Sequence, residues 1–348
     1  MTKRKVSVIL ATYGEVEEPT IKNLLPNSKR ILKYITTRIA KIPRPIVELI
    51  AWTRSFKRKK YWNNLGYRSK LNALTRNQAS KLQSVLKGDS EIDFKVADSY
   101  YFVPPYLENT LTVHRNSDAI VLVPMIPIES DFSCGVGCVI TTDTFKESAF
   151  GKVVVLKHFW NDTELLQVYA NHIFSNLQNS EKATKLGLAL AVHGTLVKGT
   201  DGLPPKANTG YKETLQFFTQ LKSFLENDPR NRFHAIKLGC LNHVYGGEWT
   251  PETLAIALEE FKSEGIEKVA VFPFGFFADN SEADLEAVEE TENAGYRGSK
   301  MQYIPCVNDS DEFIHWVAKR VKRSANHLLQ MNSSLDALSQ KQIQTPVY

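Results

Sequence analysis

The sequence is poor in cysteine, with four in 348 residues, at positions 134, 138, 240 and 306. This number and spacing exclude a disulfide framework, and Cys134 and Cys138 stand one residue too far apart for a CxxC motif. We therefore expect a protein of a reducing compartment, the cytoplasm.

Long apolar runs and a strong net charge are also absent. No stretch approaches the ~18 apolar residues that a membrane-spanning helix needs, so we expect any membrane contact to be peripheral, on the inner face of the membrane. The apolar run at 6–11 follows Lys3-Arg4-Lys5 as in a signal peptide, but it breaks at 12–14 without a small-residue cleavage site. We interpret this run as a buried strand. The net charge of +5 is modest for the length and gives no reason to expect a nucleic-acid partner.

Short apolar runs alternate with longer amphipathic segments along the chain. The runs, each typical of a strand buried on both faces, lie at 6–11, 119–126, 152–156, 186–192, 233–239 and 268–276. The segments typical of helices lie at 164–177, 212–226 and 252–263. This alternation predicts an α/β protein whose sheets are mostly parallel and flanked by helices.

The pattern starts twice, at residue 6 and again near residue 186. We therefore expect two similar doubly wound lobes with the active site in the cleft between them. Residues 1–165 would form the first lobe, 166–323 the second, and 324–348 a polar C-terminal extension. Ligands of such sheets bind at the carboxyl ends of strands, where Tyr13, His193 and the segment after Phe276 would lie.

His193 follows the apolar run at 186–192 and precedes Gly194, which permits an unusual turn. A histidine after a strand is most often structural or merely exposed. An imidazole at a strand end is also the expected position of a catalytic group, so the residues alone leave both interpretations open.

An acidic stretch at 275–293 follows the last predicted strand. Glu282, Glu286 and Glu290 recur every four residues, which places them on one face of a helix. A solvated acidic helix is the common interpretation of such a run. Because like charges at this spacing repel, a divalent cation such as Mg²⁺, Mn²⁺ or Fe²⁺ bound along the row is the alternative.

A third stretch, at 44–71, interleaves basic residues with aromatic and aliphatic ones. This composition suits a solvated basic helix, a nucleic-acid or membrane surface, or a clamp on an acidic aromatic ligand.

Together these stretches resemble the ferrochelatases, the enzymes that insert ferrous iron into a porphyrin in haem synthesis. The likeness spans roughly residues 6–322 and begins with VSVILATYGEVEEPT, LGYRSKLNALTRNQASKLQSVL and AIVLVPMIPIESDFS. In the second half, LAVHGTLV resembles the family's Ser-x-His-Gly-Leu-Pro loop and GGEWTPET its Trp-Leu-x-Pro-x-Thr stretch. FPFGFFADNSEADLEAVEE is similar to its Pro-x-x-Phe-x-Ser-Asp-His-x-Glu-Thr-Leu-x-Glu segment. The resemblance implies a metal-inserting lyase with Fe²⁺ as a substrate.

The resemblance also implies roles for single residues. His193 takes the place of the catalytic histidine and Glu282 that of the carboxylate across the porphyrin from it, and both are implied as metal ligands. Glu286 and Glu290 fall on an acidic ladder for metal, on a helix that is unusually wound in the family. Tyr13 falls where it can lie against the opposite face of the macrocycle.

The segment from about 44 to 62 corresponds to the lip of the substrate cleft. The residues that would contact the substrate are Leu49, Ile50 and Trp52 on the ring, Arg54 and Lys57 on its propionates, and Tyr211 after the His-Gly loop. The same surface makes peripheral contact with an anionic membrane an expectation.

Several positions depart from the family pattern. Asn280 stands where histidine is usual, Tyr67 and Arg68 where glycines are, and Ile126 where an aromatic residue is. These departures concern the identity of the substrate more than the type of reaction. A chelatase for cobalt or nickel and a sirohydrochlorin-like ring, and a non-catalytic porphyrin or haem carrier, therefore stay as alternatives.

The resemblance leaves the porphyrin as protoporphyrin IX or coproporphyrin III and the chain as a monomer or a homodimer. The C-terminal region has no cysteine cluster of the kind that holds an iron–sulfur centre in some members. We expect no such centre in this chain.

Overall fold

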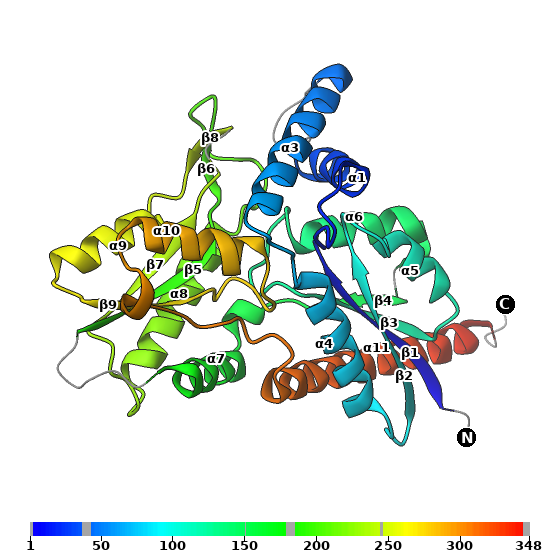
Figure 1. Ribbon diagram of the computed structural model, residues 1–348. Helices are drawn as coiled ribbons and strands as arrows, with labels where there is room; N and C mark the ends of the chain where they lie inside the picture. The colour runs from blue at the N-terminus through cyan, green and yellow to red at the C-terminus, as the bar shows by residue number, and fades with distance from the viewer. Residues whose placement is uncertain (1–2, 37–42, 150, 179–184, 244–245, 344–348) are drawn as a thin grey trace.

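The computed structural model describes residues 3–36, 43–149, 151–178, 185–243 and 246–343, and it has two lobes, each built on a sheet (Figure 1). The first sheet has the order β2-β1-β3-β4 and consists of β1 (Arg4–Thr12), β2 (Ile92–Tyr100), β3 (Ala119–Pro124) and β4 (Val153–Val155). The second has the order β10-β9-β5-β7 and consists of β5 (Leu186–His193), β7 (Ala235–Leu241), β9 (Lys268–Phe272) and β10 (Met301–Tyr303). All pairs in both sheets are parallel. The predicted α/β class is therefore confirmed.

Helices surround both sheets. The α-helices of the first half are α1 (Ile21–Ile31), α3 (Arg44–Asn64), α4 (Leu71–Leu86), α5 (Leu107–Val113), α6 (Cys134–Phe145) and α7 (Thr163–Asn176). Those of the second half are α8 (Tyr211–Glu226), α9 (Leu254–Ser263), α10 (Ala287–Asn293) and α11 (Asp311–Ile343). Shorter helical pieces are η1 (Leu32–Thr36), η2 (Lys146–Ala149), η3 (Phe159–Asn161), η4 (Ser281–Glu286) and η5 (Gly298–Lys300). A separate antiparallel pair, β6 (Leu196–Gly199) with β8 (Gly247–Trp249), lies beside the second sheet.

The central strands are apolar because helices cover both of their faces. Every residue of β3 is buried, and so are the first seven of β5. One apolar core runs from β1 and β3 of the first sheet through α7 to β5 and β9 of the second. The two lobes therefore share a core.

The last helix ties the lobes together. α11 follows the second sheet in the sequence but packs against α4 and β3 of the first lobe, and it runs past Ser324 without a break. Its buried Phe313 packs against Phe277, with ring centroids 4.8 Å apart, and Phe277 belongs to the loop after β9. The segment that we divided between the second lobe and a C-terminal extension is thus one helix that lies under the first lobe (Figure 1).

Strand β2 was not predicted from the sequence. Its sequence IDFKVADSY alternates apolar and polar residues because it forms an edge of the first sheet, with one face partly exposed. The search for continuous apolar runs missed it for this reason. None of the helices in the described part of the chain is both long enough and apolar enough to cross a membrane.

Candidate active site between the two lobes

Three elements deliver the predicted site residues to the space between the lobes. Tyr13 follows β1, His193 is the last residue of β5, and Glu282 lies in η4 after β9. Parallel strands end at the same edge of their sheet, so His193 and η4 meet at the carboxyl edge of the second sheet. The structure thus brings His193 and Glu282 together.

His193 and Glu282 form a hydrogen bond. The imidazole Nδ1 lies 2.8 Å from Glu282 Oε2. The histidine side chain is 42% exposed and the glutamate side chain 22%, so both are accessible to solvent but partly shielded from it.

Each partner shifts the pKa of the other. Burial lowers the pKa of His193, but the charge and hydrogen bond of Glu282 outweigh it and raise the pKa above its ordinary value. Burial raises the pKa of Glu282, but the charge and hydrogen bond of His193, together with His243, outweigh it and hold this pKa well below its usual range. Both shifts stabilise the state in which His193 has accepted a proton beside an ionised Glu282.

His243 joins the pair and was not predicted. Its Nε2 lies 3.3 Å from Glu282 Oε1, and its ring centroid lies 5.0 Å from that of His193. One ligand atom from each of these three residues lies within 4.8 Å of the others. His243 follows β7 as His193 ends β5, so applying the strand-end rule to the run at 233–239 would have found it.

Trp249, in β8, forms a wall of this cluster. Its ring lies 6.1 Å from that of His193 and 5.8 Å from that of His243, nearly perpendicular to both. The indole therefore makes edge-to-face contacts with both imidazoles.

Glu282 is held by an unusual helix. η4 (Ser281–Glu286) is a π-helix, a winding that occurs mostly as single turns and is frequent at functional sites. The Asn280 side chain caps it by accepting hydrogen bonds from the backbone N–H groups of Glu282, at 3.0 Å, and Ala283, at 3.2 Å. Asn280, one of the departures from the family pattern, thus positions the backbone of Glu282.

Glu15 of the first lobe is hydrogen-bonded to the start of this helix. Its carboxylate accepts hydrogen bonds from the Ser281 hydroxyl, at 2.6 Å, the Ser281 backbone N–H, at 3.1 Å, and the Ser69 hydroxyl, at 2.5 Å. A carboxylate at the start of a helix is favoured by the helix dipole. The start of η4 is therefore fixed against the loop that carries Tyr13.

The acidic row divides in two. Burial, followed by the charge of Glu282, raises the pKa of Glu286 to about 7, so these two carboxyls lie close enough to interact. Burial also raises the pKa of Glu290, but a hydrogen bond from the backbone N–H of Ala255, in the first turn of α9, opposes the rise. Glu286 thus faces Glu282, while Glu290 is held against a neighbouring helix.

Tyr13 faces the cluster from the other lobe. Burial raises its pKa well above the usual range, and the charge of Glu282 adds to this rise. Its ring stacks on Phe102 with centroids 5.7 Å apart, and its hydroxyl donates to the Phe132 carbonyl at 3.1 Å. The stacking and the hydrogen bond therefore fix the orientation of the ring, and the charge of Glu282 reaches its hydroxyl.

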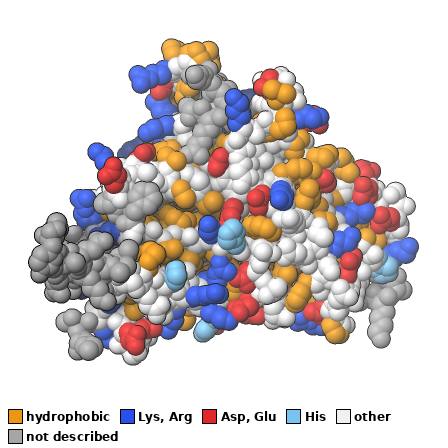
Figure 2. Space-filling view, turned by 180° about the vertical axis from the view of Figure 1, so that it is seen from behind, with side chains coloured by type: hydrophobic (Ala, Val, Ile, Leu, Met, Phe, Trp, Pro, Cys, Tyr) orange, Lys and Arg blue, Asp and Glu red, His pale blue; other side chains and the backbone are white. Residues whose placement is uncertain are grey.

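The predicted lip is the helix α3, which rises above the body of the protein (Figure 1). Its buried residues are Ala51, Ser55 and Trp62. Leu49 and Trp52 are 64% and 42% exposed, whereas Ile50 and Arg54 are partly buried and Lys57 is exposed. From behind, hydrophobic and basic side chains lie together near the top of the molecule (Figure 2).

The lower end of α3 touches the acidic helices. The Tyr61 hydroxyl bonds to Glu289, and the Tyr67 hydroxyl donates to Asp284 at 2.7 Å. Lys70 lies 3.6 Å from the other oxygen of Asp284. Tyr67, which replaces a glycine of the family pattern, thus links the lip to η4, while Arg68 is exposed beside it.

Other predicted positions lie apart from the cluster. The Tyr211 hydroxyl, at the start of α8, donates to both oxygens of Glu252, at 3.0 and 3.1 Å. Burial and this contact raise its pKa to about 12. Ile126 is partly exposed after β3.

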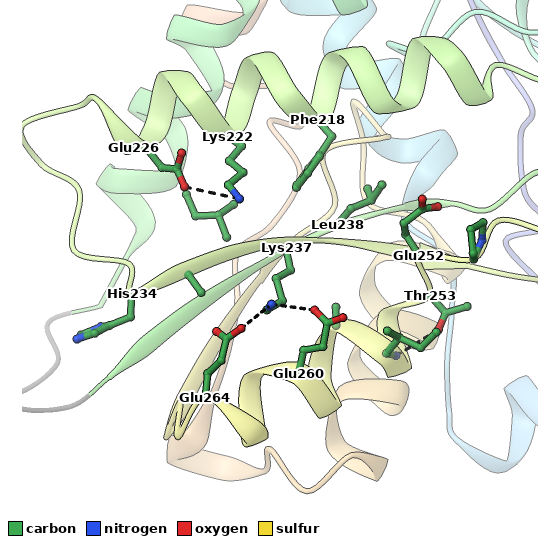
Figure 3. Close-up of a pocket in the computed structure, with 15 residues that line it drawn as sticks. Phe218, Lys222, Glu226, His234, Lys237, Leu238, Glu252, Thr253, Glu260 and Glu264 are labelled. Carbon is green, nitrogen blue, oxygen red and sulfur yellow. Dashed lines mark hydrogen bonds and ion pairs between the residues drawn. The ribbon is translucent and has the colours of Figure 1, made fainter.

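A hollow elsewhere in the second lobe is a poor alternative site. It lies between α8, β7 and α9 and has a volume of about 560 Å³ (Figure 3). Its Lys237 is paired with Glu260 and Glu264, each at 2.8 Å, and its Lys222 with Glu226 at 3.8 Å. Because these lysines and glutamates pair with one another, they are poorly placed to bind a charged ligand.

Comparison with known proteins identifies the family. A ferrochelatase of Sulfurimonas denitrificans is 22% identical over 317 residues, which cover 90% of this chain and 96% of the relative. A ferrochelatase of Helicobacter pylori strain P12 is 25% identical over 285 residues, which cover 79% of this chain and 80% of the relative. The solved structure of SirB from Bacillus subtilis with Fe³⁺ has a TM-score of 0.53 at 9% identity, covering 92% of this chain and 96% of that one, a likeness of fold alone. A model of the ferrochelatase family matches residues 5–325, and the chain belongs to that family.

Proposed function

We propose that this protein inserts Fe²⁺ into a porphyrin, protoporphyrin IX or coproporphyrin III, as a lyase of haem biosynthesis. The observation that carries the proposal is the hydrogen-bonded pair of His193 and Glu282, whose carboxylate charge also raises the pKa of Tyr13 from the first lobe. A flat macrocycle between the lobes would have Tyr13 on one face and the pair on the other.

The reaction exchanges one Fe²⁺ for two pyrrole protons, with no change of oxidation state. An imidazole is the side chain best suited to accept a pyrrole proton near neutral pH, and the His193 side chain is partly exposed. Glu282 orients this imidazole and stabilises its protonated form, since the two are bonded at 2.8 Å. Glu286, with a pKa of about 7, is suited to carry a proton away from Glu282 toward solvent.

The lip would bind the rest of the substrate. Leu49, Ile50 and Trp52 offer apolar surface to the ring, and Arg54 and Lys57 offer charge to its propionates. A helix rises ~1.5 Å per residue, so Leu49 stands about 18 Å along α3 from Tyr61, which contacts the acidic helix. The proposal therefore requires either that Leu49 contacts the outer edge of the ring or that α3 closes over the ring.

The test is anaerobic incubation of the protein with Fe²⁺ or Zn²⁺ and each porphyrin, followed by visible absorbance. We expect metallation by the wild type. His193→Ala should keep porphyrin affinity but lose at least ~100-fold in kcat, the usual contribution of a general base. The matched control is His327→Ala, an exposed histidine of α11 far from the cleft, which should act as wild type. A wild type that binds porphyrin and metallates none would overturn the proposal.

A further inference from the structure

We infer that His243 is a third protein ligand of the substrate metal, so that Fe²⁺ binds to His193, His243 and Glu282 before it meets the porphyrin. This inference rests on the proposed function for the identity of the metal. The resemblance to the family marked His193 and Glu282 but gave no role to His243.

Strand pairing places the two histidines together. In the register of β5 and β7, His193 pairs with Leu241, two residues before His243. The backbone N–H of Gly194 donates to the Leu241 carbonyl at 2.8 Å, so the segments that follow β5 and β7 stay side by side beyond the end of the strand pairing. A Cβ on Gly194 would stand 1.9 Å from Asn242 Oδ1, so only glycine permits this approach.

Further bonds fix the residue next to His243. The Asn242 amide donates to the Thr250 carbonyl at 2.8 Å, and its carbonyl oxygen accepts from the Thr250 hydroxyl at 2.7 Å. Thr250 adjoins Trp249, which packs against both imidazoles. Supports of this kind orient the ligands of metal sites.

The distances suit coordination. Ligands bound at right angles ~2.1 Å from a metal lie about 3 Å from one another. The nitrogen atoms of His193 and His243 lie 2.8 and 3.3 Å from different oxygens of Glu282, and all three ligand atoms lie within 4.8 Å. A cation could therefore replace the shared protons with small side-chain rotations.

The donor set also suits ferrous iron. Two imidazoles and one carboxylate that leave other positions open form a set that proteins use for Fe²⁺. The side chains of His193, His243 and Glu282 are 42%, 31% and 22% exposed, so a metal held by them would be accessible from solvent. Transfer would exchange three protein ligands for four ring nitrogens as two protons leave the ring, and iron stays ferrous.

The experiment measures metal binding without porphyrin. Wild type is titrated anaerobically with Fe²⁺ by calorimetry and with Co²⁺ by its visible ligand-field bands, and we expect one ion per chain. His243→Ala should bind each metal more than tenfold more weakly and change the Co²⁺ bands, whereas His327→Ala should behave as wild type. His243→Asp, which restores a ligand, should recover part of the affinity.

Wild-type affinity and unchanged Co²⁺ bands in His243→Ala, with weakened binding in His193→Ala, would overturn the inference. If His243→Ala does not fold by circular dichroism, His243→Gln keeps the volume and a hydrogen-bonding tip and takes its place. Metallation of porphyrin is measured separately. A chain that binds metal through His243 but metallates no porphyrin would support this inference and overturn the proposed function.

Discussion

At the scale of the residue, the raised pKa of the Glu286 carboxyl leads to a testable prediction about stability and pH. Burial and the charge of Glu282 raise its pKa from the ordinary 4.5 to about 7. The folded state therefore binds this proton more tightly than the unfolded state, and the protein loses stability as the pH rises from about 4.5 to about 7.

Glu286→Gln removes this loss. Allowing for partial exposure, we expect the variant to be more stable than wild type by about 1–2 kcal/mol at pH 8, with the difference disappearing below about pH 5. Urea unfolding at both pH values measures it. Glu18→Gln, at an exposed carboxyl, is the control and should change little. A Glu286→Gln variant no more stable than wild type at pH 8 would show that the pKa of Glu286 is not raised in the folded state.

Single residues also show what the sequence can and cannot predict. His193 and Glu282 were recognised from motifs, and their meeting follows from strand ends that share one edge. His243 has no motif of its own. Its place after a strand indicates the edge of the sheet on which it lies, but its hydrogen bond with Glu282 is seen only in the folded chain.

At the scale of the element, the π-helix η4 limited what the sequence could predict about the row of glutamates. Glu282, Glu286 and Glu290 recur at α-helical spacing, which predicts one row of carboxylates. In η4 the winding changes, and the pKa of Glu290, in α10, is raised by burial and lowered by the backbone N–H of Ala255, with no effect of Glu282. Spacing in the sequence assumes a regular helix and cannot reveal this change.

A prediction at this scale concerns the exposed face of α3. Its Ile46, Leu49, Trp52 and Phe56 are 48%, 64%, 42% and 55% exposed, and lysines at positions 57, 59 and 60 lie on the same helix. Apolar and basic surface together favour an anionic membrane. We expect Leu49→Ser to reduce binding to anionic vesicles several-fold in co-sedimentation.

Leu203→Ser is the matched control, since Leu203 is 62% exposed but lies outside α3. It should leave vesicle binding unchanged. Equal effects of the two substitutions would mean that α3 is not the membrane contact.

At the scale of the whole molecule, the two lobes should unfold as one unit. The apolar core is continuous from one sheet to the other, and α11 packs against the first lobe after leaving the second. The sequence predicted the two lobes from the repeated pattern. It could not assign α11, since an amphipathic helix does not specify which sheet it covers.

Phe313 in α11 tests this coupling because it is fully buried and lies 4.8 Å from the ring of Phe277 and 5.7 Å from that of Trp316. Truncation of a buried phenylalanine costs about 3–5 kcal/mol, so we expect Phe313→Ala to lower the unfolding temperature of the entire chain. Phe56→Ala, at a side chain 55% exposed, should have little effect. Scanning calorimetry should show a single shifted peak with equal calorimetric and van't Hoff enthalpies. Two peaks, of which the substitution moves one, would mean that the lobes are independent and that α11 stabilises only one of them.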